Sequence, residues 1–137
     1  MLDQIFSSPT MDYLSRGMSA ANLRHEVISN NIANINTPKF KKSDVVFETL
    51  LARELGLDKE SRLEVVRTHD RHLSIPVQER AEAAVVMDKS TVMRTDKNNV
   101  DIDKEMANLA KNQIYFNAMT KEMGSFIQRI KTTITTK

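Results

Sequence analysis

The segment His69-Asp70-Arg71-His72 comes closest to a metal site or an acid-base pair. Two histidines three residues apart could share one face of a helix and bind a metal or exchange protons. No third ligand follows at a recognisable spacing, and the surrounding residues show no helical period. We interpret the segment as a solvated polar turn. A metal enzyme built on His69 and His72 is a distant alternative, which calorimetry with zinc would test.

A second candidate runs from Asp96 to Asp103 and superficially resembles a calcium-binding loop. It departs from the loop template at three positions, where Val100, Asp101 and Ala107 replace a ligand, the glycine and the final glutamate. We expect instead the capped start of a helix, because Asp101 and Asp103 place carboxylates near the positive end of its dipole.

Composition narrows the chemistry further. The 137 residues include no cysteine, so thiolate metal sites, disulfides and cysteine nucleophiles are excluded. Only three glycines are present, and no glycine-rich phosphate loop or catalytic motif occurs. We therefore predict no catalytic residue, no cofactor and no metal. The net charge of +2 is too small to indicate a nucleic-acid partner.

Neither direct membrane insertion nor a cleaved secretory signal is expected. No apolar stretch reaches membrane-spanning length, and the start Met1-Leu-Asp-Gln-Ile-Phe6 lacks a basic region followed by a long apolar run. If the protein leaves the cytoplasm, we expect it to use another route.

Apolar residues repeat in steps of three and four at both ends of the chain, which is typical of helices that pack along a narrow seam. The N-terminal stripe consists of Met11, Leu14, Met18, Ala21, His25, Ile28, Ile32 and Ile35. The C-terminal stripe consists of Ile102, Met106, Leu109, Gln113, Phe116, Thr120, Met123, Ile127, Ile130 and Ile134. The pattern predicts a mainly α fold, in which the two helices form an antiparallel coiled-coil hairpin around a small irregular or partly β insert.

We divide the chain into four parts: 1–42, 43–57, 58–98 and 99–137. The first contains a helix that we expect to start near Ser8 or Thr10, with Pro9 in its first turn, and to end near Asn34 before Pro38. The second is a short helix over residues 43–55. The third is an insert with β-prone runs at Leu63–Arg67, Ala84–Met87 and Thr91–Arg94. The fourth is a helix from Ile102 to about Thr133.

Gly17 and Gly124 lie inside the two long helices, where each costs on the order of 1 kcal/mol relative to alanine. A register that places the two glycines opposite each other would let the backbones approach closely. This register, which could equally join neighbouring chains, pairs Met11 with Ile130, Leu14 with Ile127, Met18 with Met123, Ile32 with Leu109 and Ile35 with Met106. His25 would then lie beside Phe116 and tune the register.

Four asparagine amides fall within residues 30–36, followed by Thr37-Pro38 and the basic segment Lys39-Phe40-Lys41-Lys42. The amides could cap the helix and shape the turn that follows it. Because a single cap requires fewer, hydrogen bonds between subunits are an open alternative. The lysines could face an acidic partner, although solvation is the simpler interpretation.

This segment resembles the flagellar basal-body rod and hook axial proteins, whose N-terminal signature is Asn-Asn-(Ile/Leu)-Ala-Asn, two variable residues, Thr-Pro-Gly-Tyr and a basic residue. Lys41 stands in the basic position. The matching residues are Asn30, Asn31, Ile32, Ala33, Asn34, Thr37 and Pro38. Lys39 replaces the usual glycine and Phe40 the usual tyrosine. The segments 99–106 and 109–116 resemble the C-terminal helix of a proximal rod member, with Gln-Ile-Tyr where sister subunits have Arg-Ala-Tyr or Arg-Ser-Tyr.

The resemblance implies a structural subunit of the proximal rod that polymerises through its terminal helices, transmits torque and lines the export channel. It implies as partners other rod subunits, the hook-basal body complex protein, and components of the MS ring and the export gate. It also implies export through the flagellar type III apparatus without signal cleavage. Two alternatives stay open: a sister rod subunit, and a cytosolic coiled-coil adaptor or export chaperone.

Two sets of residues are predicted to mediate assembly. The first lies on the helix seams and comprises Met11, Leu14, Met18, Ile28, Ile32, Ile35, Met106, Leu109, Phe116, Met123, Ile127 and Ile130. The second lies off the seams, where a two-helix hairpin cannot bury it, and comprises Leu23, Val27, Ile114, Tyr115, Met119 and Phe126. We expect neighbouring subunits to cover this second set.

Overall fold

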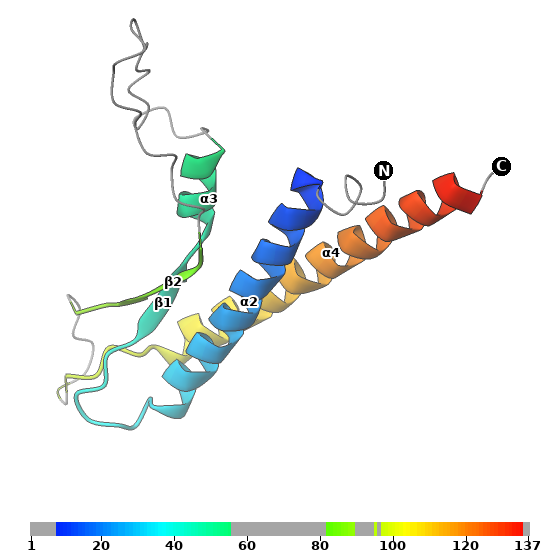
Figure 1. Ribbon diagram of the computed structural model, residues 1–137. Coiled ribbons are helices and arrows are strands. Elements are labelled where there is room, and N and C mark those ends of the chain that lie inside the picture. Colours follow the sequence, from blue (N-terminus) through cyan, green and yellow to red (C-terminus); the bar gives the residue numbers. More distant parts are fainter. Residues whose placement is uncertain (1–7, 56–81, 90–94, 96, 136–137) are drawn as a thin grey trace, which may run out of the picture.

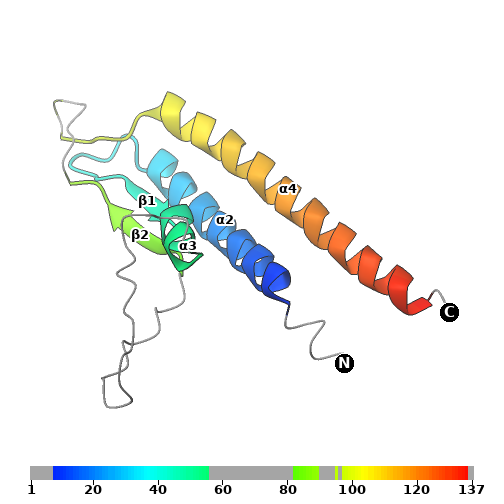
Figure 2. The same ribbon diagram turned by 90° about the horizontal axis from the view of Figure 1, so that it is seen from above.

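The computed structural model describes residues 8–55, 82–89, 95 and 97–135. Helix α2 (Pro9–Ala33) and helix α4 (Ile102–Thr135) run antiparallel, and α4 extends beyond the start of α2 (Figures 1 and 2). Strand β1 (Ser43–Val46) packs against α2 and pairs with strand β2 (Ala84–Met87), and helix α3 (Glu48–Glu54) follows β1 in the chain. The predicted mainly helical fold, with long terminal helices and a small β element between them, is confirmed. The expected β runs at 63–67 and 91–94, like His69 and His72, fall outside the described residues.

Local sequence explains both helix starts. Ser8 is the N-cap of α2, where its Oγ accepts a hydrogen bond from Met11 N at 3.4 Å and Pro9 occupies the first turn. In front of α4, Asp101 Oδ1 accepts from the backbone N–H groups of Asp103 and Lys104 at 3.1 and 3.3 Å. The segment is thus a capped helix start, as expected.

The structure differs from expectation at residues 43–55. Ser43–Val46 form a strand, and the helix begins only at Glu48. The strand pairs antiparallel with β2, with Ser43 opposite Met87 and Val46 opposite Ala84. Tertiary pairing therefore overrides the helical spacing of the apolar residues, and β-branched Val45 and Val46 suit a strand.

The predicted helix register is wrong. A Cβ built on Gly17 would lie 2.8 Å from Met119 Sδ, whereas one on Gly124 meets nothing within 4 Å. Asn112 Nδ2 donates to Ala21 O at 2.9 Å, and Asn31 Nδ2 donates to Glu105 Oε2 at 3.0 Å. These contacts displace α4 from the glycine-paired register by between five and eight residues. The glycines therefore do not face each other within the chain.

The buried face of α2 is also rotated from the predicted stripe. It consists of Gly17, Ala20, Ala21, Ile28 and Asn31, while His25 is exposed. Phe47 is buried, and its ring lies 4.0 Å from the position that a Cβ on Gly17 would occupy. Helix α2 packs against β1 and Phe47 as well as against α4. Its small residues Gly17, Ala20 and Ala21 therefore turn inward, and the larger Met11, Leu14 and Met18 are only half-buried.

Candidate assembly surface and polar junction

The asparagines of the family-like segment and of the α4 start form one polar junction, which we define as Asn31, Asn98, Asn99 and Glu105. All four residues are at least 95% buried. They come from α2, from the residues before α4 and from the first turn of α4. The sequence suggested that the amides of residues 30–36 act as local caps or as contacts between subunits. Asn34 does cap α2 locally, because its Nδ2 donates to Asn30 O at 2.9 Å and its Oδ1 accepts from Thr37 Oγ1 at 3.2 Å. The contacts of Asn31 instead join distant parts of a single chain.

Asn31 connects α2 to the outer edge of β1. Its Oδ1 accepts from Ser43 N at 3.0 Å and its Nδ2 donates to Ser43 O at 2.8 Å, so one side chain takes the place of a neighbouring strand. The same Nδ2 donates to Glu105 Oε2. This single amide therefore connects α2, β1 and α4.

Asn98 and Asn99 complete the junction. Asn98 Nδ2 lies 2.9 to 3.1 Å from the carbonyl oxygens of Asn34, Ile35 and Thr37, in the turn that follows α2. Asn99 Oδ1 accepts from Lys42 N at 2.7 Å, and its Nδ2 donates to Asp88 O at 3.0 Å. The paired asparagines thus fix both the turn after α2 and the end of the β1–β2 sheet at Lys42 and Asp88. In the sequence, the available sign of this junction was the pair Asn98-Asn99 directly before a predicted helix.

Two arginines of α2 position α3. Arg16 makes a two-pronged ion pair with Glu54, at 3.1 Å from Nη1 to Oε1 and 2.6 Å from Nη2 to Oε2. Arg24 Nη2 lies 2.6 Å from Glu48 Oε2 and donates to Val45 O at 3.2 Å. Hydrogen bonding to Arg24 holds the pKa of Glu48 below its ordinary value, and the Glu48 contact raises the pKa of Arg24.

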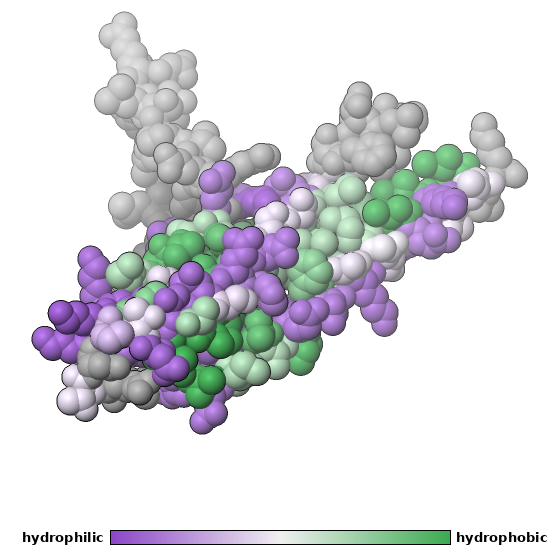
Figure 3. Space-filling view, turned by 90° about the horizontal axis from the view of Figure 1, so that it is seen from below, coloured by the Kyte–Doolittle hydropathy of each residue, from purple (hydrophilic) through white to green (hydrophobic). Residues whose placement is uncertain are grey.

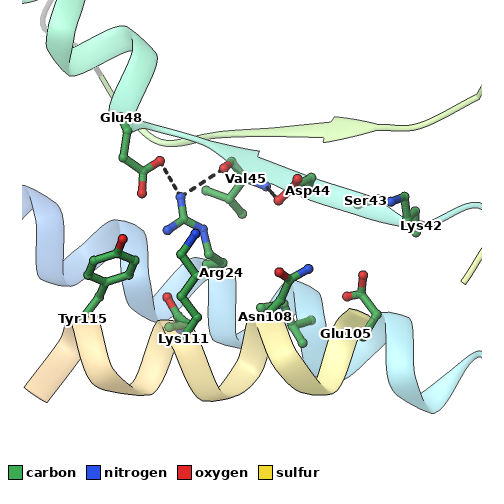
Figure 4. Close-up of a pocket in the computed structure, with 12 residues that line it drawn as sticks. Arg24, Lys42, Ser43, Asp44, Val45, Glu48, Glu105, Asn108, Lys111 and Tyr115 are labelled. Carbon is green, nitrogen blue, oxygen red and sulfur yellow. Dashed lines mark hydrogen bonds and ion pairs between the residues drawn. The ribbon is translucent and has the colours of Figure 1, made fainter. Parts of the chain in front are cut away.

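A polar pocket of about 330 Å³ lies between α2, β1 and α4. Figure 4 shows Arg24 bridging Glu48 and Val45 on one side, with Tyr115, Lys111, Asn108 and Glu105 along α4. Asn112 also lines the pocket, and its Oδ1 is buried without a hydrogen-bond partner. Within the described ranges, no group of three or more His, Cys, Asp or Glu residues could hold a metal ion.

The predicted assembly residues are distributed unevenly. Ile28 is buried, and a larger group is half-buried: Met11, Leu14, Met18, Leu23, Val27, Ile32, Ile35, Leu109, Phe116, Met119, Met123, Phe126 and Ile130. A smaller group on α4 is exposed: Met106, Ile114, Tyr115 and Ile127, joined by Ile102 and Ile134. The helix pair thus uses part of the apolar surface internally and leaves the rest on α4 open.

In the part of the chain that the structure describes, no helix is both long and apolar enough to span a membrane. The long helix α4 alternates its apolar residues with lysines, glutamates and amides, so its apolar surface is a stripe.

Comparison with known proteins agrees with the motifs. The family described as "Flagella basal body rod protein" matches residues 11–41, which include the Asn-rich segment and Thr37-Pro38. The "Flagellar basal body rod protein FlgB" of Bacillus subtilis strain 168 is 38% identical over 128 residues, covering 93% of this chain and 95% of the relative. FlgB of Borrelia hermsii is 36% identical, covering 81% of this chain and 84% of the relative. FlgB of Borreliella burgdorferi is 33% identical, covering 88% and 92%.

These relatives extend across both long helices and across the insert, and each carries the name FlgB rather than that of a sister subunit. The chain therefore belongs to the FlgB family of flagellar basal body rod proteins.

Proposed function

We propose that this rod component polymerises with neighbouring subunits through the exposed apolar residues of α4 and the half-buried apolar residues of α2. In that arrangement it would transmit torque and contribute to the wall of the export channel. The observation that carries the proposal is the exposed apolar surface of α4, where Met106, Ile114, Ile127 and Ile134 are 51%, 69%, 50% and 58% exposed.

The length of α4 supports this proposal. If the contact between Gly17 and Met119 is continued along both helices, Pro9 lies level with Ile127. The last eight residues of α4 then extend beyond the first residue of α2, and the two helices diverge toward that end (Figure 1). Figure 3 shows hydrophobic side chains along α4 as far as its C-terminal end. A helix of this kind gains its stability from packing against other helices.

A second apolar surface continues from the first. A groove of about 490 Å³ lies between α2, α3 and α4 and is lined mainly by apolar side chains, including Tyr13, Leu14, Phe47, Leu51 and Met119. Burying the remaining surface of a half-exposed leucine or isoleucine contributes on the order of 1 kcal/mol. Several such residues on one subunit can offset the entropy lost when helices dock.

Repeated head-to-tail contacts between such surfaces generate a helical filament. We include as partners the other rod subunits, the hook-basal body complex protein, and components of the MS ring and of the export gate. Delivery by the flagellar type III apparatus without a cleaved signal is part of the same proposal.

Deletion and complementation in the host would test the proposal. The informative variants are Ile114→Asp and Ile127→Asp, because both side chains are exposed in the free chain and a carboxylate there should not disturb its fold. We expect loss of filaments and of complete rods, since burying an unpaired carboxylate costs several kcal/mol.

The neighbouring Asn117→Asp and Gln128→Asp provide matched controls on the same exposed helix. We expect these two variants to restore rods, as the intact chain does. Normal filaments in the deletion strain would refute the rod function. Full rescue by both Ile114→Asp and Ile127→Asp, which lie on different sides of α4, would refute assembly through its exposed apolar residues.

A further inference from the structure

The two outer edges of the β1–β2 sheet differ in how their backbone groups are hydrogen-bonded. An edge strand presents backbone N–H and C=O groups that can pair with another chain, and proteins usually cover or block such groups. Within the described residues the sheet consists of two short strands, and a sheet of this size is marginally stable without further packing. One edge is covered by side chains of this chain, whereas no described residue hydrogen-bonds to the other.

The ladder register identifies which groups face outward. Asp88 N donates to Lys42 O at 2.9 Å, so residues 88 and 42 form a hydrogen-bonded pair. Such pairs recur every second residue in an antiparallel ladder. The backbone groups of Val86 and Ala84 therefore face β1, whereas those of Val85 and Met87 face away from it.

The β1 edge is satisfied within the chain. Both backbone groups of Ser43 bond to the Asn31 amide, Val45 O accepts from Arg24, and Val45 N donates to Asp44 Oδ1 at 2.8 Å. These bonds fall on the residues that the ladder register directs outward, which supports the assignment.

The β2 edge lacks such cover. Among the described residues, the structure contains no hydrogen bond to the outward N–H or C=O of Val85 or Met87. Val85, Val86 and Met87 are 51%, 51% and 53% exposed. No lysine or proline lies inside the strand to block pairing. We call the outward backbone groups of Val85 and Met87 the β2 edge.

We propose that the β2 edge binds an extended segment of a neighbouring rod subunit, which adds as a third strand and carries acidic residues beside Lys89. This inference rests on the proposed rod assembly. Strand addition uses main-chain hydrogen bonds for affinity and alternating side-chain contacts for specificity. Val85 and Met87, two residues apart, lie on the same face and would supply the apolar contact.

The lysines at one end of β2 indicate that the bound segment is acidic at that end. Asn99 holds Lys42 beside Asp88, and Asn98 holds the carbonyl of Thr37. Because Asp88 N donates to Lys42 O, Lys42 and Lys89 lie at the end of β2 that follows Met87, and Lys39 and Lys97 lie within two residues of the bonded Thr37 and Asn98. Figure 3 shows hydrophilic side chains concentrated at this end of the molecule. Opposite charges across an interface favour correct register and faster association.

A second copy of the same edge is disfavoured as the occupant. Two identical edges that pair with each other form a closed twofold contact, which cannot by itself continue a filament. Rod growth requires a different segment on the partner, so that every subunit keeps one donor and one acceptor surface.

The decisive variant is the double change Val85→Pro, Met87→Pro. Proline removes the two outward N–H groups and leaves the ladder to β1 its donors, because the N–H groups that face β1 belong to Ala84, Val86 and Asp88. The matched control is Val85→Thr, Met87→Thr, which keeps both N–H groups and a side chain of good strand propensity at position 85. Complemented deletion cells would be scored for rods by electron microscopy, and the purified chains would be compared by thermal unfolding.

We expect at least a tenfold fall in rods for the proline variant, with unfolding midpoints unchanged, and near-normal rods for the threonine variant. Normal rods with the proline variant, alongside failure of Ile127→Asp, would overturn the β2 edge proposal and leave the proposed function standing. If the proline variant unfolds, Val85→Lys, Met87→Lys blocks the edge without changing the backbone.

Charge and self-association supply two further readouts. We expect Lys89→Glu to reduce the number of rods several-fold, and Glu82→Lys at the opposite end of β2 to have little effect. Equal numbers of rods from these two variants would overturn the proposal that the bound segment carries acidic residues. Sedimentation of the purified chain showing a dimer that the proline variant abolishes would assign the edge to a second copy and overturn the proposal.

Discussion

The side chain of Asn31 hydrogen-bonds both backbone groups of Ser43, and no strand lies between them. Ser43 N donates to Asn31 Oδ1 at 3.0 Å, and Asn31 Nδ2 donates to Ser43 O at 2.8 Å. A helical residue thereby provides the hydrogen bonds that a neighbouring strand would supply. Because Nδ2 also reaches Glu105, the family-like Asn-rich segment has a structural role inside the subunit.

Changing Asn31 to Asp should destabilise the free chain by on the order of 3 kcal/mol. The variant loses the donor to Ser43 O and places a second carboxylate near buried Glu105. Chemical unfolding of the purified chain measures the change.

The double variant Asn31→Asp, Glu105→Gln should recover part of the loss, because the two carboxylates no longer meet. Asn30→Asp on the exposed neighbour should cost less than about 1 kcal/mol. A loss of equal size at residues 30 and 31 would contradict a specific role for the Asn31 amide.

Changing Lys39 to Gly should stabilise the protein by about 0.5–1 kcal/mol. Lys39 adopts a φ of 62°, in the left-handed region that favours glycine. The family signature has glycine at this position, so the lysine keeps the backbone turn at an energetic cost. Lys41→Gly, where φ is not positive, should instead be destabilising. Unfolding midpoints that fall for both variants would argue against strain at residue 39.

Changing Gly124 to Ala should stabilise the free chain by about 1 kcal/mol, because helix propensity improves and the added methyl meets open space. Gly17→Ala should gain much less, since the new Cβ displaces Met119 Sδ from a distance of 2.8 Å. Thermal unfolding of the two variants compares them directly. Equal stabilisation by both changes would contradict the observed contact between Gly17 and Met119.

Acid should weaken the attachment of α3. The pKa of Glu48 lies below its unfolded value because Arg24 hydrogen-bonds to the carboxylate. Its contribution to stability is therefore present above the unfolded pKa, about 4.3, and is lost as the pH falls through the lower folded pKa. Because the Glu48 side chain is 64% exposed, the effect should stay below about 1 kcal/mol.

Thermal unfolding between pH 6 and pH 3 would show this effect as a larger fall for the wild type than for Glu48→Gln. The exposed Glu26→Gln variant should follow the wild type. Identical pH profiles for the wild type and Glu48→Gln would show that this ion pair contributes nothing measurable.

The two long helices and their caps could be predicted from local sequence, because three-four apolar spacing, Ser8 with Pro9, and Asp101 act within a few residues of chain. The sequence also determined the family resemblance, through the Asn-rich segment and Thr37-Pro38. These signals are local, so they survive without knowledge of the partner elements.

Tertiary structure decided which faces meet. The large apolar residues of α2 suggested one seam, but Gly17, Ala20 and Ala21 turn inward because small side chains admit Phe47 and α4 at close range. The strand at Ser43–Val46 exists because β2, Asn31 and Arg24 satisfy its backbone from sites that lie at least 12 residues away in sequence. Bonds between distant residues leave no periodic trace in a sequence, so only the folded chain shows them.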